Sequence, residues 1–576
     1  MASGGMRCET EQEICFRDAA GFCTIPAMLS SYYKTGSARE QALLLPARIE
    51  DYVGRDNAVR AIEAYVASLD LAERKFRHAE RVAGAGQPPY DPADLLRLYL
   101  YGYLNQIRSS RRLEREAGRN IELMWLLRGL QPGYRTIGQF RSDNVGALKQ
   151  ANRDFVTALR ELDLLGRELV AIDGAFFDGN ASKASIVTRK RLDEQLAVVD
   201  REIAAAEREI EDYAAALDAN DAAEAAEPDA KPRPNDDVAG KLAALLAKRR
   251  AVAADVATLE ASGQTQLSRT DADARLLSKN GQSVAGYNVQ IAVDDKHKLI
   301  VADEVVNDGN DTGQLHAMAQ AACAAVGADT LQAVADTGYF NGETLKACED
   351  SAIEAFVPEP RRGKRLEAAG RFGIEAFVYD AAADAYHCPA GKPLHAMGGG
   401  KLDQSGKLRI YYASRRLVCS RCPKRQKCLS PKAARRVIER WEHEDVIERH
   451  RRRMATGEAM MRRRKALVEH PFGTLKCRAG YRHFLMRGFD KVRGELGLMV
   501  LCYNFTRALN IVGLERLLAW FAARSLLAAF CLLAAILTAA ERLRGGCRVG
   551  WSGMIATLAG PLRRYRTIWS VAAAVT

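Results

Sequence analysis

Three acidic residues have the types and surroundings that a metal-dependent nuclease requires. Asp173 ends the apolar run Glu168-Leu-Val-Ala-Ile-Asp, Asp336 ends Leu331-Gln-Ala-Val-Ala-Asp, and Glu469 lies in Val468-Glu-His-Pro-Phe-Gly. Each aspartate is followed by Gly or Thr-Gly, so we expect both carboxylates at the C-terminal edge of buried strands, where α/β sheets place their chemistry. Carboxylate oxygens bind hard cations such as Mg²⁺, and two such ions support phosphoryl transfer.

The size and charge of the chain limit the kinds of protein that it can be. With 576 residues it exceeds the length that one core usually serves, which predicts several domains or large insertions. The formal net charge is +12, and basic tracts such as Arg449-His-Arg-Arg-Arg453 and Arg462-Arg-Arg-Lys465 concentrate in the second half. These tracts suit a polyanionic partner such as nucleic acid, although any one of them alone would equally suit a solvated helix face. The 13 cysteines lack regular pairing and the start lacks a secretory pattern, which together predict a reducing, cytoplasmic setting.

The first part of the chain is expected to be helical. Residues 1–36 show no periodicity and are taken as an extension, and residues 37–160 are predicted to form a helical domain. Its apolar residues Ile62, Tyr65 and Val66 recur at helical steps, and Asp91 caps the next apolar run. Short helices around residues 135–141 favour a helix-turn-helix that contacts DNA ends, with a plain helical bundle as the alternative.

A long helical insertion is predicted at residues 187–262. Two apolar seams at heptad spacing are separated by a polar, proline-containing link. The short link favours an antiparallel hairpin within one chain over dimerisation through the same seam. The seam residues are Leu192, Leu196, Val199, Ile203, Ala206, Ile210, Tyr213 and Leu217, then Leu242, Leu245, Val252, Val256 and Leu259.

Strand patterns surround this insertion. A β-hairpin is predicted from residues 286–293 and 299–306, followed by a helix at about 312–326 and the strand that ends in Asp336. The predicted elements follow the order of an RNase H-like fold: a strand, a hairpin, a helix, a second strand and a later helix that carries Glu469. The predicted class is therefore α/β, with a mixed sheet flanked by helices over residues 161–514, interrupted by the helical hairpin and by a cysteine-rich insertion at 360–440.

Together these residues resemble the DDE transposases of bacterial insertion sequences, in the branch with a Tyr-Arg-Glu-Lys signature around the last carboxylate. The resemblance covers residues 39–514, about four fifths of the chain. The motifs that carry it are Ile172-Asp-Gly, Gly286-Tyr-Asn-Val-Gln, Asn310-Asp-Thr, Ala335-Asp-Thr-Gly-Tyr-Phe, Val468-Glu-His-Pro-Phe-Gly-Thr-Leu-Lys and Arg487-Gly-Phe-Asp-Lys-Val-Arg-Gly-Glu.

The resemblance implies roles for individual residues. Asp173, Asp336 and Glu469 map onto the catalytic triad, with Asp173 bridging two Mg²⁺ ions, for which Mn²⁺ is expected to substitute, and each other carboxylate holding one ion. Lys476 maps onto the signature lysine. The aromatic and arginine positions of the signature fall on Arg462 and Lys465, which is a departure from the family pattern.

The residues around Glu469 predict a helix face that meets DNA. Lys465, Glu469, Phe472 and Lys476 step by four, three and four, so a helix would place them on one side, with Arg462, Lys465 and Lys476 available to phosphate. Pro471 is expected at a helix start or a kink. Glu495 competes as third carboxylate, but its apolar surroundings indicate a packing helix.

Four cysteines form a second group with ligand chemistry. Cys388, Cys419, Cys422 and Cys428 include one Cys-x-x-Cys pair and could close a tetrahedral Zn²⁺ site, with free thiols as the alternative. His387 or His395 could replace one thiol as a ligand. The basic residues between them would face phosphate.

Residues 515–576 form an apolar extension. The clean apolar run, residues 526–540, is shorter than the roughly 20 residues that cross a bilayer, so a tail helix or a dispensable extension is expected rather than a membrane span.

The predicted function is DNA cleavage at insertion-sequence ends and strand transfer into target DNA. The expected partners are double-stranded DNA, namely the terminal inverted repeats and the target, and a second copy of the chain, because bringing two ends together makes a homodimer the natural expectation. Two alternatives remain: a catalytically inactive protein that binds element ends, and a nuclease that cleaves without joining.

Overall fold

The fold is that of a computed structural model, and its described residues fall into two compact units, residues 1–52 and 53–576. In the first unit β1 (Phe16–Arg17) pairs with β2 (Cys23–Thr24) in antiparallel fashion, and the rest of the predicted extension lies outside the described residues. The second unit contains every element below. The described residues are 16–17, 23–24, 48–80, 88–224, 236–279, 281–360, 368, 370–403 and 406–525.

The described residues before the central sheet contain the α-helices α1 to α6, and the helical N-terminal region that the sequence predicts is confirmed. Ile62, Tyr65 and Val66 are buried on α1, and Asp91 caps α2 by accepting a hydrogen bond from the Ala93 N–H at 2.9 Å. The helices share one hydrophobic core with the central sheet. Their bounds are α1 (Val59–Ala67), α2 (Pro92–Leu104), α3 (Ser110–Ala117), α4 (Ile121–Leu126), α5 (Tyr134–Asp143) and α6 (Val145–Glu161).

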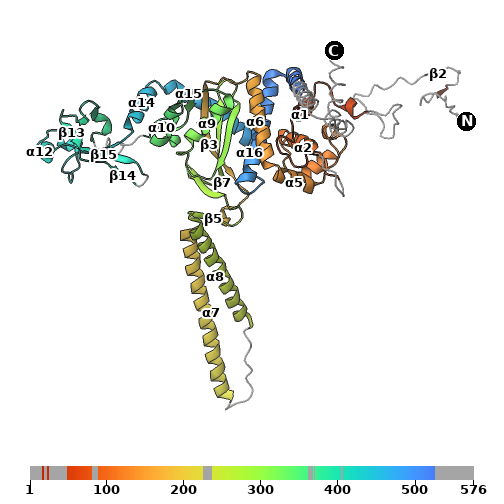
Figure 1. Ribbon diagram of the computed structural model, residues 1–576. Helices are drawn as coiled ribbons and strands as arrows, with labels where there is room; N and C mark the ends of the chain where they lie inside the picture. Colours follow the sequence, from red (N-terminus) through yellow and green to blue (C-terminus); the bar gives the residue numbers. More distant parts are fainter. Residues whose placement is uncertain are drawn as a thin grey trace, which may run out of the picture. The chain divides into compact units, whose positions relative to one another are not determined.

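The central sheet has strands in the order β10-β9-β3-β7, with β8 and β6 both pairing with β7. β3 and β7 lie side by side in this sheet (Figure 1). β3 runs parallel to β9, which runs parallel to β10, whereas β7 is antiparallel to β3, β8 and β6. The predicted hairpin is confirmed as β7 and β8. The bounds are β3 (Leu169–Asp178), β6 (Arg275–Lys279), β7 (Gln282–Asp294), β8 (Ile300–Val306), β9 (Leu331–Val334) and β10 (Ile353–Phe356).

Helices from three parts of the chain pack on this sheet. α9 (Leu315–Val326) contacts β3, β7 and β8 and begins later than predicted, and α10 (Gly342–Asp350) contacts β10. α15 (Glu458–Gly473) contacts β3, β7 and β9, and α16 (Phe489–Val512) contacts β8, α2 and α6. α15, the helix that carries Glu469, therefore contacts the strand that carries Asp173.

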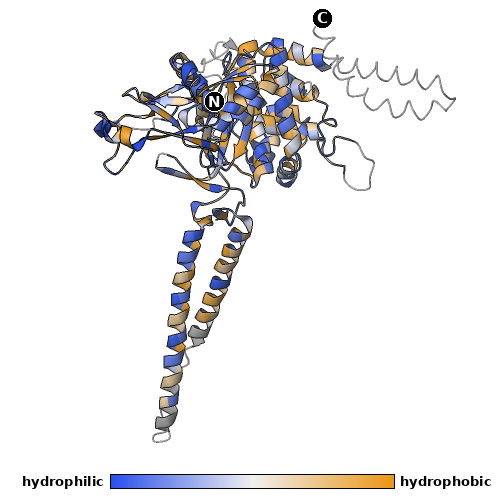
Figure 2. Cartoon of the chain, turned by 60° about the vertical axis from the view of Figure 1, so that its left-hand side comes forward, coloured by the Kyte–Doolittle hydropathy of each residue, from blue (hydrophilic) through white to orange (hydrophobic). Residues whose placement is uncertain are grey.

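The predicted helical hairpin consists of α7 (Arg189–Glu224) and α8 (Asp236–Ser262), which pack along each other (Figures 1 and 2). Arg189 pairs with Glu260, and Asp200 pairs with Arg249, so the helices are antiparallel. Leu192, Val199, Val252 and Leu259 of the predicted seams are buried, together with Ile203 and Ala206. At the end of the hairpin next to the central sheet, β4 (Ile186–Thr188) pairs with β5 (Gln266–Ser268) (Figure 1).

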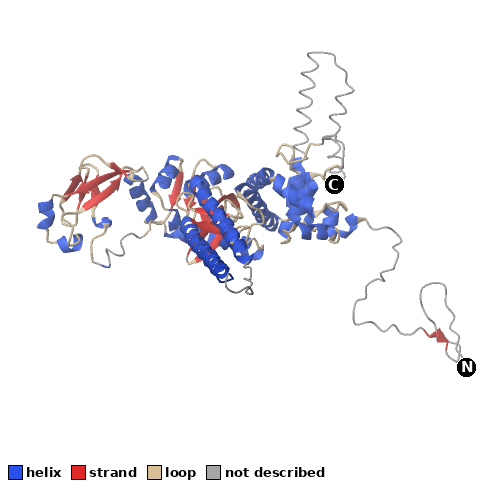
Figure 3. Cartoon of the chain, turned by 90° about the horizontal axis from the view of Figure 1, so that it is seen from below, coloured by secondary structure: helices blue, strands red, loops and turns tan. Residues whose placement is uncertain are grey.

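A second sheet occupies the cysteine-rich region, which the sequence predicted only as an insertion. Its strands follow the order β11-β12-β13-β15-β14, with β16 on β15, and all these pairs are antiparallel. Figure 3 shows strands of the protein in red and its helices in blue. Short helices α12 (Arg416–Ser420) and α13 (Arg425–Cys428) follow β15, and α14 (Glu444–Met454) follows β16. The bounds are β11 (Val378–Asp380), β12 (Ala385–His387), β13 (Pro393–Ala396), β14 (Lys401–Leu402), β15 (Leu408–Ala413) and β16 (Val437–Trp441).

Apolar helices near the end of the described chain raise the question of whether the chain crosses a membrane. No single helix among the described residues is long and apolar enough to cross a bilayer; α16 and the helix Leu514–Ser525, bent by 113°, reach that length and composition only as a pair. The middle of α16 is buried in the protein core. The predicted apolar run 526–540 lies outside the described residues.

Candidate carboxylate site

Asp173 and Asp336 come together because two parallel strands are in register. Ala171 on β3 lies opposite Val334 on β9, and each aspartate follows its strand partner by two residues. Asp336 also caps the short helix after β9, since its carboxylate accepts the Gly338 N–H at 2.9 Å. The sequence prediction that Asp173 ends its strand is wrong: β3 continues to Asp178 because β7 pairs with it over nine residues, Val170 to Asp178.

The Arg464 side chain of α15 lies between these two carboxylates. Its Nη2 atom is 2.8 Å from Asp173 Oδ1 and 3.7 Å from Asp336 Oδ2. The two aspartates therefore flank one position that a cation occupies. Nothing in the sequence pattern singled out Arg464 among the neighbouring basic residues, which is why the prediction missed it.

A buried polar network lies behind the aspartate pair. Asp311 accepts hydrogen bonds from Asn288 Nδ2 at 2.8 Å and Gln290 Nε2 at 2.7 Å, and Tyr339 donates to Gln290 Oε1. Burial raises the pKa of Tyr339 well above its ordinary value, and the negative charges of Asp311, Asp173 and Asp336 add to this effect. These side chains come from the motifs Gly286-Tyr-Asn-Val-Gln, Asn310-Asp-Thr and Ala335-Asp-Thr-Gly-Tyr-Phe. The motifs therefore contain these residues, but the sequence did not predict that they support the aspartates.

Glu469 does not complete this site as the structure stands. Its side chain is 66% exposed and lies 3.8 Å from Lys465 on the same helix. Across the part of the chain that the structure describes, no group of three or more His, Cys, Asp or Glu side chains is placed to hold a metal ion. Pro471 lies inside α15, near its end, so of the two predicted alternatives, a helix start or a kink, the helix start is wrong.

The predicted basic residues divide into two kinds. Lys465 and Arg462 are exposed on α15. Lys476, in the π-helical turn Thr474–Arg478, donates to the Phe176 carbonyl at 2.7 Å and lies 4.6 Å from the centre of the Phe177 ring. Its amine is thus fixed on β3, three residues beyond Asp173, whereas Phe472 is buried in the core. The four predicted residues therefore do not share one exposed face.

Glu495, the competing carboxylate, has a structural role. It is fully buried on α16 and accepts hydrogen bonds from the Leu485 N–H at 2.9 Å and the Met486 N–H at 3.0 Å. The Arg108 and Arg141 guanidinium groups lie 3.7 and 4.0 Å away. The indication of a packing helix is confirmed for this residue.

The four cysteines line one small cavity of about 30 Å³. Cys388 opens a turn in which its Sγ accepts the Lys392 N–H at 3.4 Å, and α12 and α13 bring Cys419, Cys422 and Cys428 to the same cavity. Burial raises the pKa of Cys428, and the other three thiols raise it further. The Nε2 atom of His387, one of the two histidines predicted as a replacement ligand, lies 3.7 Å from Asp380 Oδ2. The thiols are neighbours, although as placed they do not form a ready metal cage.

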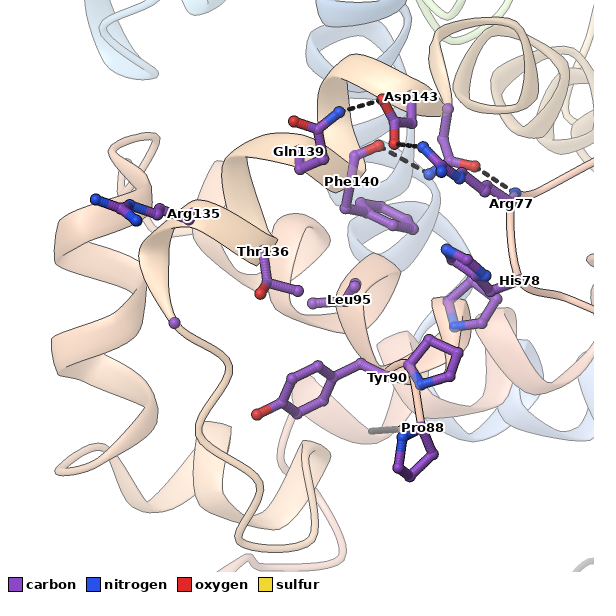
Figure 4. Close-up of a pocket in the computed structure, with 14 residues that line it drawn as sticks. Arg77, His78, Pro88, Tyr90, Leu95, Arg135, Thr136, Gln139, Phe140 and Asp143 are labelled. Atoms are coloured by element: carbon purple, nitrogen blue, oxygen red, sulfur yellow. Dashed lines mark hydrogen bonds and ion pairs between the residues drawn. The ribbon is translucent and has the colours of Figure 1, made fainter. Parts of the chain in front are cut away.

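A larger cavity, of about 570 Å³, lies among the N-terminal helices (Figure 4). Arg135, Thr136 and Gln139 of α5 line one side, and Pro88 and Tyr90 line another. Asp143 at the end of α5 accepts a hydrogen bond from Gln139 at 2.5 Å and forms an ion pair with Arg77. The cavity thus presents polar and basic groups of one helix to solvent.

These features define an α/β protein with a helical N-terminal region and a paired-aspartate site on adjacent parallel strands. Residues 387–509 match the family described as Transposase DDE domain, and residues 47–143 match the family described as Transposase domain (DUF772). Together the two matches support a DDE transposase of an insertion sequence.

The matched segments cover different parts of the fold. The first runs from the second sheet through α15 to α16 and includes Glu469, and the second covers α1 to α5. No curated protein and no solved structure matches the chain. The roles of Asp173 and Asp336, which lie outside both segments, therefore rest on the geometry above.

Proposed function

We propose that this transposase cleaves DNA at the ends of its insertion sequence and transfers the freed strands into target DNA. The observation that carries the proposal is the pair Asp173, on β3, and Asp336, just after β9, which the register of the two strands sets around one cation position. Carboxylates so placed suit the charge that develops on the attacking and leaving oxygens of a phosphodiester.

An RNase H-like core is part of this proposal. The strand order β8-β7-β3-β9-β10 supports it, with the antiparallel strands on one side of β3 and the parallel ones on the other. The helical hairpin α7–α8 and the cysteine-rich sheet would then be insertions in that core. In this arrangement the first aspartate lies on the central strand and the second follows the adjacent parallel strand.

The donor set fits Mg²⁺ in part. Asp173 and Asp336 already flank a cation, the Arg464 guanidinium, and their oxygens are the ligands that hard cations prefer. Glu469 would join them only after α15 moves. When bound, Mg²⁺ or Mn²⁺ would stabilise the negative charge of the transferring phosphate and lower the pKa of an attacking water.

The chain's own residues would bind and position the DNA. Arg462 and Lys465, exposed on α15, would hold phosphates beside the aspartates, while Lys476 fixes the end of that helix on β3. In the N-terminal region Arg135, Thr136 and Gln139 of α5 would contact the element ends at the edge of the large cavity. A homodimer in the cytoplasm would bring two ends together.

Binding through α5 has a direct test. Arg135→Ala and Gln139→Ala should weaken binding to end DNA, and Arg119→Ala, which removes an exposed arginine paired with Glu116 outside the cavity, should not. Loss of one phosphate contact should reduce the slope of log affinity against log salt by about 0.9. Equal affinity of all three variants for end DNA would contradict DNA binding through α5.

We also propose that the four cysteines hold a structural Zn²⁺ once their side chains turn toward each other. Support comes from the shared cavity and from the Lys392 N–H that donates to Cys388 Sγ. Purified protein should contain about one zinc per chain, lost in Cys419→Ser and kept in Cys477→Ser, whose thiol is exposed. Zinc-free protein with reactive thiols would favour the free-thiol alternative.

The test of the main proposal is strand transfer by purified protein in Mg²⁺, with DNA that carries the element ends. Asp336→Asn should abolish both cleavage and joining, whereas Asp329→Asn, in an exposed loop before β9, should retain both. Cleavage without joining in the wild type would indicate a nuclease. End binding without cleavage in every variant would indicate an inactive binding protein.

A further inference from the structure

The position between Asp173 and Asp336 is already filled by a charge of this chain. Arg464 is only 14% exposed, and its Nε atom is buried without a hydrogen-bond partner among the described residues. A buried guanidinium with an unsatisfied donor costs free energy, so the two carboxylates must supply a compensating attraction. Its placement is therefore set by the aspartate pair.

Two carboxylates on adjacent strands repel each other unless a cation lies between them. Either a guanidinium or a divalent ion can neutralise that repulsion, but both cannot occupy the same position, because their positive charges repel strongly in a partly buried site. The Arg464 side chain and a metal ion are therefore competitors for Asp173 and Asp336.

We propose that Arg464 is a latch that closes the site of the metal-free transposase and must leave before a divalent ion binds. The inference rests on the proposed function, because it takes the aspartate pair as the metal site. It assigns to Arg464 the role of a gate on metal entry, in addition to any contact with DNA after release.

The geometry of α15 shows what release involves. Arg464 and Glu469 are five residues apart, so at 3.6 residues per turn they point roughly 140° apart. The helix now presents Arg464 to the aspartates and leaves Glu469 exposed. A rotation of α15 about its axis would withdraw the cation and bring the carboxylate toward the pair in one movement.

Both ends of α15 are built to permit such a rotation. Pro471 lies inside the last turn and cannot donate the helical hydrogen bond, and the chain continues as a π-helical turn, Thr474–Arg478. At the other end Gly457 precedes the helix and separates it from α14. Irregular turns at both ends allow the helix to change its rotation, and the buried side chains of Leu467, Val468 and Phe472 must repack when it does.

The latch can be tested by Mn²⁺ binding to the full-length protein without DNA, measured by electron paramagnetic resonance. Arg464→Gln should bind Mn²⁺ at least about tenfold more tightly than wild type, because the competing charge is gone. Arg463→Gln is the matched control: it removes the adjacent arginine, which pairs with Asp295, and should leave the affinity unchanged.

A second measurement uses the unaltered chain. Phenylglyoxal should modify Arg464 slowly in the metal-free protein and several-fold faster with Mn²⁺, as read by mass spectrometry, with Arg463 as the internal reference. Unchanged or weaker Mn²⁺ binding in Arg464→Gln, or equal labelling of Arg464 with and without metal, would overturn the latch.

Failure of the metal site itself would look different. If the wild type binds Mn²⁺ and Asp173→Asn does not, the proposed site stands whatever Arg464 does. If no protein, Arg464→Gln included, binds Mn²⁺ above the level of Asp173→Asn, both the latch and the aspartate metal site are rejected.

Discussion

Gly174 shows how a single residue shapes the site. A Cβ atom at this position would lie 2.3 Å from Gln290 Nε2 and 2.6 Å from Asp311 Oδ1, closer than any real contact. The Asp-Gly pair on β3 is therefore required by the close approach of the buried network, and not by a turn.

We expect Gly174→Ala to lower the unfolding free energy by about 1 to 3 kcal/mol, the usual range for an overpacked core, and to reduce strand transfer. The matched control is Gly146→Ala on α6, where an added Cβ has nothing within 4 Å. Because alanine favours helix, the control should gain about 0.5 to 1 kcal/mol. Calorimetric melting points that move in the same direction for both variants would contradict the packing argument.

Glu495 gives a second prediction at this scale. Glu495→Gln places an amide NH₂ against the Arg108 or Arg141 guanidinium or against two backbone donors, so it should cost about 2 to 4 kcal/mol of stability. Strand transfer measured well below the melting point should persist, because the residue is not in the carboxylate site. Glu515→Gln, on the exposed side of the last described helix, should change neither.

Glu469 is expected to respond differently from Glu495, because its proposed role is in the reaction and not in stability. Glu469→Gln should leave the melting point nearly unchanged, since its side chain is largely exposed, and should abolish strand transfer. If instead Glu495→Gln abolished transfer with little loss of stability, the third carboxylate would have been misassigned.

The sequence predicts those parts of the site that depend on short stretches of the chain. Asp173 and Asp336 each end a local apolar run, and strand register then places them side by side. Arg464 is one of four consecutive basic residues, and its contact depends on the rotation of α15, which no short pattern encodes. Asp311 and Gln290 lay within quoted motifs, but only tertiary packing shows that they support the aspartates.

At the scale of elements, the contact between α6 and β8 carries a pH-dependent charge. Asp303 on β8 accepts a hydrogen bond from Asn152 on α6 at 2.8 Å, and burial raises the pKa of Asp303 to about 6. Lys149 and Arg153 of α6 oppose that shift, and Glu304 adds to it. A raised carboxyl pKa means that the folded state binds the proton more tightly than the unfolded chain.

The contribution of Asp303 to stability is therefore fully present below the unfolded pKa of about 4 and is lost as the pH rises through about 6. Asp303→Asn removes this loss, so it should be roughly 1 to 3 kcal/mol more stable than wild type at pH 8 and nearly equal to it at pH 4. Urea unfolding of both proteins across this range measures the difference. A difference that is constant with pH would contradict the assignment.

Long or strongly periodic elements were predictable, whereas short ones were not. The hairpin β7–β8, the helices α1 and α2 and the seams of α7 and α8 follow from apolar periodicity over many residues. The strands of the second sheet are two to six residues long and hold together by mutual pairing, so each alone gives too little pattern. The end of β3 was misjudged because pairing with β7 extends the strand past the glycine that seemed to stop it.

At the scale of the whole molecule, α7 and α8 are joined to the rest of their unit through one small ladder. Thr188 pairs with Gln266 where β4 and β5 meet, so the two chains that enter and leave the helices lie next to each other. The helices bury their seams against one another. This geometry makes the pair a self-contained hairpin that a two-residue turn can replace.

Replacing residues 189–265 by Asn-Gly should therefore preserve the core. Val187 packs against Leu192 and Leu259, so the deletion variant should also carry Val187→Thr to avoid an exposed apolar side chain. We expect helical circular dichroism to fall while the melting point of the remainder changes little. The particle mass from light scattering should fall only by the deleted residues, because the seam is satisfied within one chain. A dimeric wild type that becomes monomeric on deletion would show instead that the same seam also joins two copies of the transposase.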